Sequence, residues 1–218
     1  MDWQGDIPVG EEGDRYYAGD GLAEGRHVYL AGCGLPERFA PGFRIAELGF
    51  GTGLNLAIAL RAWRGAGVEG PLRYTGFETR PLLRADMARA LSAFPEIARE
   101  AGEIVSASPE NGTLCRVVLP DLDAEIRIGD ARTRVPAWDG TADAWFLDGF
   151  APALNPEMWE EGLLRAVAAR LAPGGMASSF TAAGHVRRAL AAAGLLVERR
   201  AGFGRKRHMT VATAPPAG

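Results

Sequence analysis

The fold is decided by the stretch Glu47-Leu48-Gly49-Phe50-Gly51-Thr52-Gly53-Leu54-Asn55, which follows the short apolar run 43–46. Glycine has no Cβ, so alternating glycines let a strand turn sharply into a helix and let the backbone approach a ligand closely. The helix predicted over 54–63 carries apolar residues at helical spacing, so one face can pack on a sheet. The pattern is typical of a strand end that holds a nucleotide-like ligand; a tight turn without a ligand is the alternative.

Two acidic residues distinguish between the possible ligands. A dinucleotide site reads Gly-x-Gly-x-x-Gly with an acid about 20 residues later, whereas this loop reads Gly-x-Gly-x-Gly, with Glu47 before it and Glu78 after the predicted strand 72–77. A carboxylate can accept hydrogen bonds from two ribose hydroxyls. S-adenosylmethionine has no pyrophosphate, and an acidic loop tolerates its positive sulfonium. We therefore predict a methyl-donor site with contacts from Glu47, Gly49, Gly51, Gly53, Asn55 and Glu78.

The composition indicates one α/β domain. The chain has 218 residues, of which 47% are hydrophobic and 23% charged, which is ordinary for a globular protein. The net charge of −3 argues against a wholly basic protein that coats nucleic acid, but it allows a local basic patch. Cys33, Cys115 and three scattered histidines show no metal-ligand spacing, so we expect neither zinc nor a disulfide framework.

The N-terminal sequence and the hydropathy pattern indicate where the protein works. The first six residues lack the basic and apolar regions of a signal peptide. No window approaches the run of about eighteen apolar residues that a membrane-spanning helix needs. We therefore expect a cytoplasmic protein without a membrane partner.

From residue 43 onward, predicted strands and helices alternate, which favours a mostly parallel sheet with helices on both faces. We predict seven main strands and an inserted hairpin whose arms are 115–119 and 124–128. The first forty residues do not share this rhythm, so we predict an N-terminal β extension over 1–40 that packs on a core domain over 41–214. Strands are expected at 43–48, 72–77, 142–147, 176–180, 196–200 and 209–213, and helices at 54–63, 83–93, 157–171 and 183–193.

Two aspartates follow predicted strands of this sheet. Ligands of open α/β sheets bind at the carboxyl ends of strands, so Asp130 is placed to accept a hydrogen bond from the adenine amine. A helix-capping aspartate is the alternative. Asp148 begins a stiff loop with glycine and two prolines, where it can hydrogen-bond an incoming amine that attacks the donor's methyl group. A loop-capping acid is again the alternative.

The motifs together resemble the methyltransferase half of the bifunctional bacterial tRNA 5-methylaminomethyl-2-thiouridine biosynthesis protein and its stand-alone relatives. The resemblance covers about residues 14–212, and its most specific part is Leu147-Asp148-Gly149-Phe150-Ala151-Pro152-Ala153-Leu154-Asn155-Pro156-Glu157-Met158-Trp159. The other matching motifs are Asp20-Gly21-Leu22-Ala23-Glu24, the glycine loop, Phe180-Thr181-Ala182-Ala183-Gly184 and Gly202-Phe203-Gly204-Arg205-Lys206-Arg207. Glu78-Thr79-Arg80-Pro81-Leu82 and Glu24-Gly25-Arg26 depart from the family's usual residues beside the acids but keep the acids themselves.

The resemblance implies a class I, Rossmann-like methyltransferase that uses S-adenosylmethionine. It implies methylation of a 5-aminomethyl group on the wobble uridine of tRNA, with Asp148 matching the family's proposed catalytic aspartate and Glu78 its ribose contact. The flavin-dependent oxidoreductase half of the fusion is absent from this sequence, so a separate oxidoreductase is expected to act upstream. A methyltransferase for another amine, either a small molecule or a protein side chain, and a non-catalytic nucleoside-binding module are the alternatives.

The substrate contacts are predicted from two further features. Arg205, Lys206 and Arg207 form the densest basic stretch, which can meet tRNA phosphates or simply be a solvated face. Phe150 lies in the loop after Asp148 and is predicted to contact the substrate. Phe203 can stack on a base or fill the core, and the core is the preferred interpretation.

Overall fold

A computed structural model describes residues 2–5, 7–10, 13, 15–17, 19–110 and 112–217. The predicted N-terminal extension includes residues 1, 6, 11, 12, 14 and 18, which lie outside the described residues, as do 111 and 218. Asp14, where the family resemblance begins, is one of them.

The centre of the molecule is a sheet with the strand order β5-β6-β4-β3-β7-β8-β10-β9. β3, β4, β6, β7 and β8 are parallel, and β10 is antiparallel to both β8 and β9. The strands are β3 (Arg44–Leu48), β4 (Leu72–Glu78), β5 (Arg116–Leu119), β6 (Leu122–Ile128), β7 (Ala142–Leu147), β8 (Leu171–Ser179), β9 (Leu196–Ala201) and β10 (His208–Thr213). The prediction of a mostly parallel sheet is confirmed.

In the part of the chain that the structure describes, the main sheet has eight strands rather than the predicted seven. The predicted hairpin is present as the antiparallel pair β5 and β6, but β6 is also paired in parallel with β4. The hairpin is therefore not an appendage. Its second arm belongs to the main sheet and its first arm, β5, becomes an additional edge strand.

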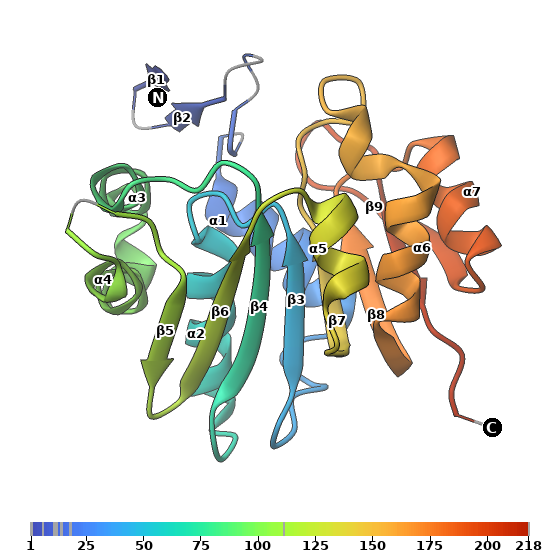
Figure 1. The fold of residues 1–218 in the computed structure, drawn as a ribbon, viewed down its shortest axis with the longest axis horizontal. Coiled ribbons are helices and arrows are strands. Elements are labelled where there is room, and N and C mark those ends of the chain that lie inside the picture. Colours follow the sequence, from blue (N-terminus) through green and yellow to red (C-terminus); the bar gives the residue numbers. More distant parts are fainter. Residues whose placement is uncertain are drawn as a thin grey trace.

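Helices cover both faces of the sheet (Figure 1). α2 (Leu54–Ala66) and α4 (Ala98–Ala107) contribute to one hydrophobic cluster, and α5 (Ala131–Ala137), α6 (Glu161–Ala169) and α7 (Gly184–Ala192) contribute to the other. α3 (Arg84–Ser92) packs beside α4, and short turns of helix occur at η3 (Pro95–Ile97) and η4 (Pro156–Trp159). Within the described part of the chain, no helix combines the length and the apolar character needed to cross a membrane.

Several boundaries differ from the sequence prediction. α4 and α5 were not predicted, and the single helix expected over 157–171 is divided into η4 and α6. The division lies at Glu160, whose extended backbone (φ −62°, ψ 143°) interrupts the helical hydrogen bonds. β8 starts at Leu171, earlier than expected, because Pro173, Gly174 and Gly175 lie within the strand instead of separating it from the helix.

The N-terminal segment contains less β structure than its sequence suggests. β1 (Asp2–Gln4) and β2 (Ile7–Val9) form a small antiparallel sheet, and the chain is then helical in α1 (Gly21–Gly25), η1 (Arg26–Leu30) and η2 (Ala31–Cys33). Val28, Tyr29 and Leu30 are buried in the main hydrophobic cluster. The division into units 1–40 and 41–214 remains a prediction.

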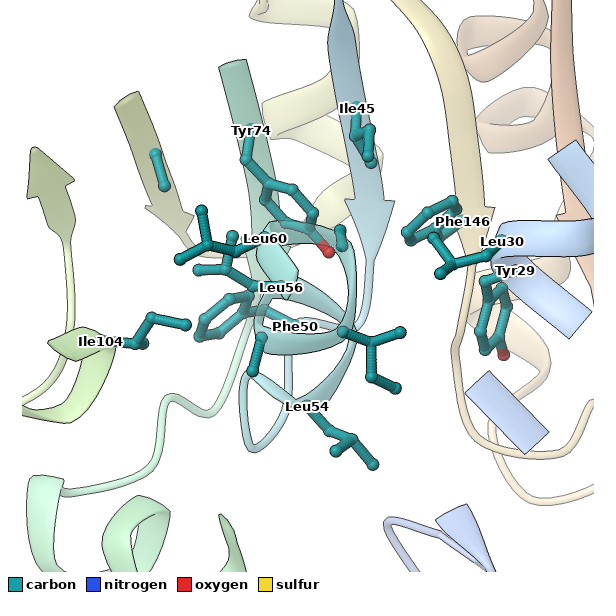
Figure 2. Packing of buried hydrophobic residues seen from close by; sticks show 14 of the residues in the cluster. Tyr29, Leu30, Ile45, Phe50, Leu54, Leu56, Leu60, Tyr74, Ile104 and Phe146 are labelled. Atoms are coloured by element: carbon teal, nitrogen blue, oxygen red, sulfur yellow. The ribbon is translucent and has the colours of Figure 1, made fainter. Parts of the chain in front are cut away.

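Buried aromatic side chains fix the positions of the strands that carry the site. Figure 2 shows Leu56 and Leu60 of α2 close to Tyr74 of β4, while Tyr29 and Phe146 lie together beyond β3. The ring centroids of Tyr29 and Phe146 are 5.5 Å apart. On the opposite face Trp145 stacks on Phe77, with centroids 5.7 Å apart and an interplanar angle of 14°. Such aromatic burial contributes strongly to core packing, and Trp145 and Phe146 are both fully buried core residues.

Candidate active site

A pocket of about 1040 Å³ opens where the carboxyl ends of β3, β4 and β7 meet. The chain leaves β3 toward β4 and β6 on one side and returns to β7 on the other. This is the switch point of an open α/β sheet, where ligands bind. Of the residues predicted to form the site, the pocket wall includes Gly49, Gly51, Asn55, Glu78, Asp130, Asp148, Phe150 and Lys206.

The glycine loop is held against the neighbouring strand ends. The amide of Gly49 donates to the carbonyl of Phe77 at 3.0 Å, and the amide of Asp148 donates to the carbonyl of Leu48 at 3.0 Å. Gly49, Gly51 and Gly53 have φ values of 78°, 53° and 80°, which favour glycine. A Cβ on Gly49 would lie 2.0 Å from the carbonyl oxygen of Asp148. The first glycine is therefore required both by conformation and by the close approach of β7.

Gly53 lies behind the pocket wall. A Cβ at this position would lie 3.1 Å from Cζ of Phe50 and 3.4 Å from Cε of Met87, so Gly53 permits close packing at the start of α2. The residue is outside the pocket lining, and the ligand contact predicted for it stays a prediction.

Both carboxylate oxygens of Asp148 are held by hydrogen bonds. Its Oδ1 accepts from the hydroxyl of Tyr29 at 2.6 Å, and its Oδ2 accepts from Nδ2 of Asn55 at 2.7 Å. Part of its surface faces the pocket, yet burial raises its pKa from 3.8 to about 6. The hydrogen bonds from Tyr29 and Asn55 limit this rise. At neutral pH the carboxylate is ionised, and its position is fixed by two donors.

Glu47 lies behind Asp148 and is completely buried. Its Oε2 accepts from the hydroxyl of Tyr74 at 2.6 Å, and its Oε1 accepts from the Asn55 amide that also serves Asp148, at 2.7 Å. Burial, followed by the charge of Asp148, raises the pKa of Glu47 well above its usual value. Glu47 is linked to Asp148 through the Asn55 amide and lies outside the pocket lining. The direct donor contact predicted for Glu47 from its position before the glycines stays a prediction.

Glu78 and Asp130 both line the pocket, with different partners. Glu78 accepts from the backbone amides of Gly51 at 2.9 Å and Arg80 at 2.8 Å, which ties the glycine loop to the end of β4. Each carboxylate oxygen keeps a lone pair for a further donor. Asp130 caps α5 by accepting from the amide of Arg132 at 2.8 Å. Its hydrogen bonds with the Arg132 side chain lower its pKa. The observed hydrogen bonds of Asp130 are those of a helix-capping aspartate, which was the alternative interpretation. Asp130 also lines the pocket, where a ligand can reach it.

Tyr29 is a site residue that the sequence motifs did not single out. It belongs to η1, is buried, and its hydroxyl reaches Asp148 across 119 positions of sequence. Burial, with the nearby carboxylates, raises its pKa well above the usual value, so it remains a hydrogen-bond donor. Tyr74 supports Glu47 in the same way. An isolated tyrosine in an apolar run carries no local signal for such a role, since only the fold creates the contact.

The residues predicted to contact the substrate are separated by the fold. Phe150 faces the pocket against Tyr16, with ring centroids 5.3 Å apart, and its carbonyl accepts from Nε1 of Trp159 at 2.9 Å. Lys206 also lines the pocket, whereas Arg205 and Arg207 are exposed and outside its described lining. Phe203, in the same loop, packs partly against the core.

A sequence comparison connects this geometry to a known family. The profile described as S-adenosyl-L-methionine-dependent methyltransferase matches residues 95–215, more than half of the chain. The chain belongs to this family. The fold and the methyl donor predicted from the glycine loop and its acids are thereby confirmed.

Relatives of this methyltransferase also confirm the resemblance stated from its motifs. It is 48% identical over 215 residues to the tRNA 5-methylaminomethyl-2-thiouridine biosynthesis bifunctional protein MnmC of Caulobacter sp. (strain K31), covering 93% of this chain and 36% of that protein. The MnmC protein of Chromohalobacter salexigens is 43% identical, with coverages of 94% and 31%. The chain spans about a third of the length of these curated relatives. The crystal structure of MNMC2 from Aquifex aeolicus matches with a TM-score of 0.79 and 25% identity, covering 97% of this chain and 69% of that one.

The pocket of this methyltransferase fits its donor. Its volume is slightly above the range of about 300–1,000 Å³ typical of small-molecule sites, and Gly49 and Gly51 form part of its wall. Glu78 and Asp130 offer acceptors at neighbouring strand ends for ribose hydroxyls and an adenine amine. S-adenosylmethionine carries no phosphate, so its site needs no backbone cradle for an anion. This agrees with the carboxylates of Glu78, Asp130 and Asp148 in the pocket wall.

Replacing Tyr29 with phenylalanine tests whether it controls the charge state of Asp148. Loss of the hydroxyl removes a hydrogen bond that lowers the pKa of Asp148, so the acidic limb of kcat/KM is expected to move upward by roughly half to one pH unit. A pH–rate profile measures the shift. Tyr17→Phe is the control, because its hydroxyl donates to the carbonyl of Ala90 instead. An unchanged limb in Tyr29→Phe contradicts the assignment.

Proposed function

We propose that this chain transfers a methyl group from S-adenosyl-L-methionine to the 5-aminomethyl group of the wobble uridine in tRNA, giving 5-methylaminomethyluridine or its 2-thio form. The single observation that carries the proposal is the 48% identity with MnmC over 93% of this chain, because that protein's name assigns it to 5-methylaminomethyl-2-thiouridine biosynthesis in tRNA. The position of Asp148, Gly149 and Phe150 in the pocket wall supports the same assignment.

The reaction needs a positioned, neutral amine more than it needs an activated leaving group. When bound, S-adenosyl-L-methionine would supply the methyl group: the amine's lone pair forms the new nitrogen–carbon bond, and the two electrons of the broken carbon–sulfur bond stay on sulfur. Asp148 is proposed to accept a hydrogen bond, or a proton, from the amine nitrogen. Tyr29 and Asn55 hold both Asp148 oxygens, so the carboxylate is oriented before the acceptor arrives.

The proposed acceptor is part of a large polyanion, and the exposed Arg205 and Arg207 offer positive charge beside the pocket. Contacts of this kind with phosphates supply affinity without reading sequence. We propose that a separate flavin-dependent oxidoreductase provides the aminomethyl group before this chain acts. The donor contacts of Gly49, Gly51, Asn55, Glu78 and Asp130 and the substrate contact of Phe150 are proposed on their positions in the pocket wall.

The proposal is tested by methyl transfer to purified tRNA. Radiolabelled donor is incubated with tRNA from cells that lack this gene, and the nucleosides are analysed by mass spectrometry. The expected result is conversion of 5-aminomethyl-uridine nucleosides to their methylated form, with no transfer to tRNA from wild-type cells. Labelling of small amines or proteins in a nuclease-treated extract, without labelling of tRNA, would instead support the alternative acceptor class.

A further inference from the structure

The ammonium group of Lys206 occupies a specific position inside the pocket. Its Nζ is 2.8 Å from Oε1 of Glu24 and lies over the ring of Phe180, 4.0 Å from the centroid. All three residues line the pocket that also contains Asp148. A carboxylate and an aromatic face together form a site that suits an alkylammonium ion.

The two sides of this ion pair differ in how firmly they are held. The Glu24 side chain is only 14% exposed, on a helix whose N-terminus is capped by the Asp20 carboxylate. Lys206 is 42% exposed and comes from the loop between β9 and β10. Partly exposed ion pairs contribute little free energy, and lysine has a long, flexible stem. The Glu24 carboxylate is therefore fixed in the pocket, while the Lys206 ammonium group can leave it.

The charges of this pair act on Asp148. Glu24 raises the pKa of Asp148 and Lys206 lowers it. Glu24 and Lys206 are therefore close enough to act electrostatically on Asp148. Asp148 is the carboxylate that the proposed function pairs with the amine of the acceptor. The proposed acceptor group, an aminomethyl substituent, is in its protonated form a primary alkylammonium like the end of a lysine side chain.

We propose that Glu24 and Phe180 form the subsite that recognises the acceptor's alkylammonium group, and that Lys206 fills this subsite until the acceptor displaces it. The inference rests on the proposed function, which supplies an amine as the acceptor. It makes Glu24 and Phe180 specificity-determining residues: they favour an aminomethyl group over a neutral group of the same size. Displacement also frees the Lys206 cation for a phosphate of the incoming polyanion.

Binding of two nucleosides to the full chain tests the proposal. The probes are 5-aminomethyluridine and the neutral 5-hydroxymethyluridine, titrated by NMR in the presence of saturating S-adenosylhomocysteine. The unmodified chain is expected to prefer the amine by about tenfold or more, as for a charge-assisted contact. Glu24→Gln is expected to remove most of this preference while leaving hydroxymethyluridine affinity unchanged. Phe180→Leu should reduce the preference by about threefold.

Lys206→Met separates displacement from simple charge neutralisation. If Lys206 competes for the subsite, its removal tightens 5-aminomethyluridine binding by roughly threefold to tenfold; weaker binding would overturn the proposal. Glu198→Gln is the matched control, because Glu198 pairs with Arg200 on β9 away from the pocket lining, and it should change nothing. Unchanged S-adenosylhomocysteine affinity shows that each variant is folded.

Two outcomes distinguish this inference from the proposed function. If Glu24→Gln retains the full preference for the amine while the unmodified chain methylates tRNA, the subsite is wrong and the proposed function stands. If the preference is present and depends on Glu24, but no tRNA is methylated, the alkylammonium subsite stands and the tRNA assignment fails.

Discussion

Replacing Asp148 with asparagine is expected to lower kcat for methyl transfer by about two to four orders of magnitude, the range typical of a positioned acid–base group. Asparagine can keep both neighbouring hydrogen bonds, since its oxygen can accept from Asn55 while its amide donates to the hydroxyl oxygen of Tyr29. The substitution therefore removes the negative charge with little change of shape. Single-turnover kinetics with bound donor measures the effect on the chemical step.

The matched control is Asp123→Asn, which removes an exposed carboxylate paired with Arg116 on the β5–β6 hairpin. Its kcat is expected to stay within about twofold of the original, as for a surface substitution. Donor affinity should be nearly equal in the two variants. Full turnover by Asp148→Asn would show that the reaction does not use this carboxylate.

Asp148→Asn is expected to lower activity but to raise the stability of the fold at pH 8. Folding raises the pKa of the Asp148 carboxyl group from 3.8 to about 6. Such a group contributes fully to the free energy of unfolding at pH values below 3.8, and this contribution is lost as the pH rises through about 6. The shift corresponds to at most about 3 kcal/mol, and pocket water reduces this to roughly 1–2 kcal/mol. Asp148→Asn is therefore expected to increase the free energy of unfolding at pH 8. The gain should disappear at pH 4, which denaturant titrations at both pH values can check.

Replacing Gly49 with alanine is expected to abolish donor binding and to destabilise the fold. A positive φ of 78° costs an alanine roughly 1–2 kcal/mol. The added Cβ would also lie 2.0 Å from the carbonyl oxygen of Asp148, so β3 and β7 must separate at the pocket. We expect a loss of about 3–5 kcal/mol in the free energy of unfolding. Denaturant unfolding and calorimetric titration with S-adenosylhomocysteine measure the two effects.

The variant Gly67→Ala separates the two costs of Gly49→Ala, the strained backbone conformation and the steric clash of the added Cβ. Gly67 has a φ of 65° at the C-terminus of α2, and a Cβ there has no atom within 4 Å. This variant is expected to lose only about 1 kcal/mol and to bind the donor normally. Equal losses in both variants would show that contact between the glycine loop and β7 is unimportant.

Local patterns in the sequence were sufficient to predict much of the sheet. Apolar runs followed by glycine or acid predicted β3, β4 and β7 to within a residue or two, because a buried parallel strand and its turn leave a strong short-range signal. α5 was missed because it is a short helix that contains Pro136. Residues 115–128 carried the hairpin signal, but only pairing with β4 made β6 a strand of the main sheet.

The sequence alone determined the glycine loop and the acids at the strand ends, Asp148 among them, since each is part of a continuous motif with its own chemistry. The tertiary structure alone decided what holds Asp148: Tyr29 from η1 and Asn55 from α2 meet it from distant positions. It also turned Lys206 toward Glu24 while Arg205 and Arg207 stayed outside the pocket lining. The physical reason is that hydrogen bonds and ion pairs depend on distances between atoms, and contacts between residues far apart in sequence exist only once the chain has folded.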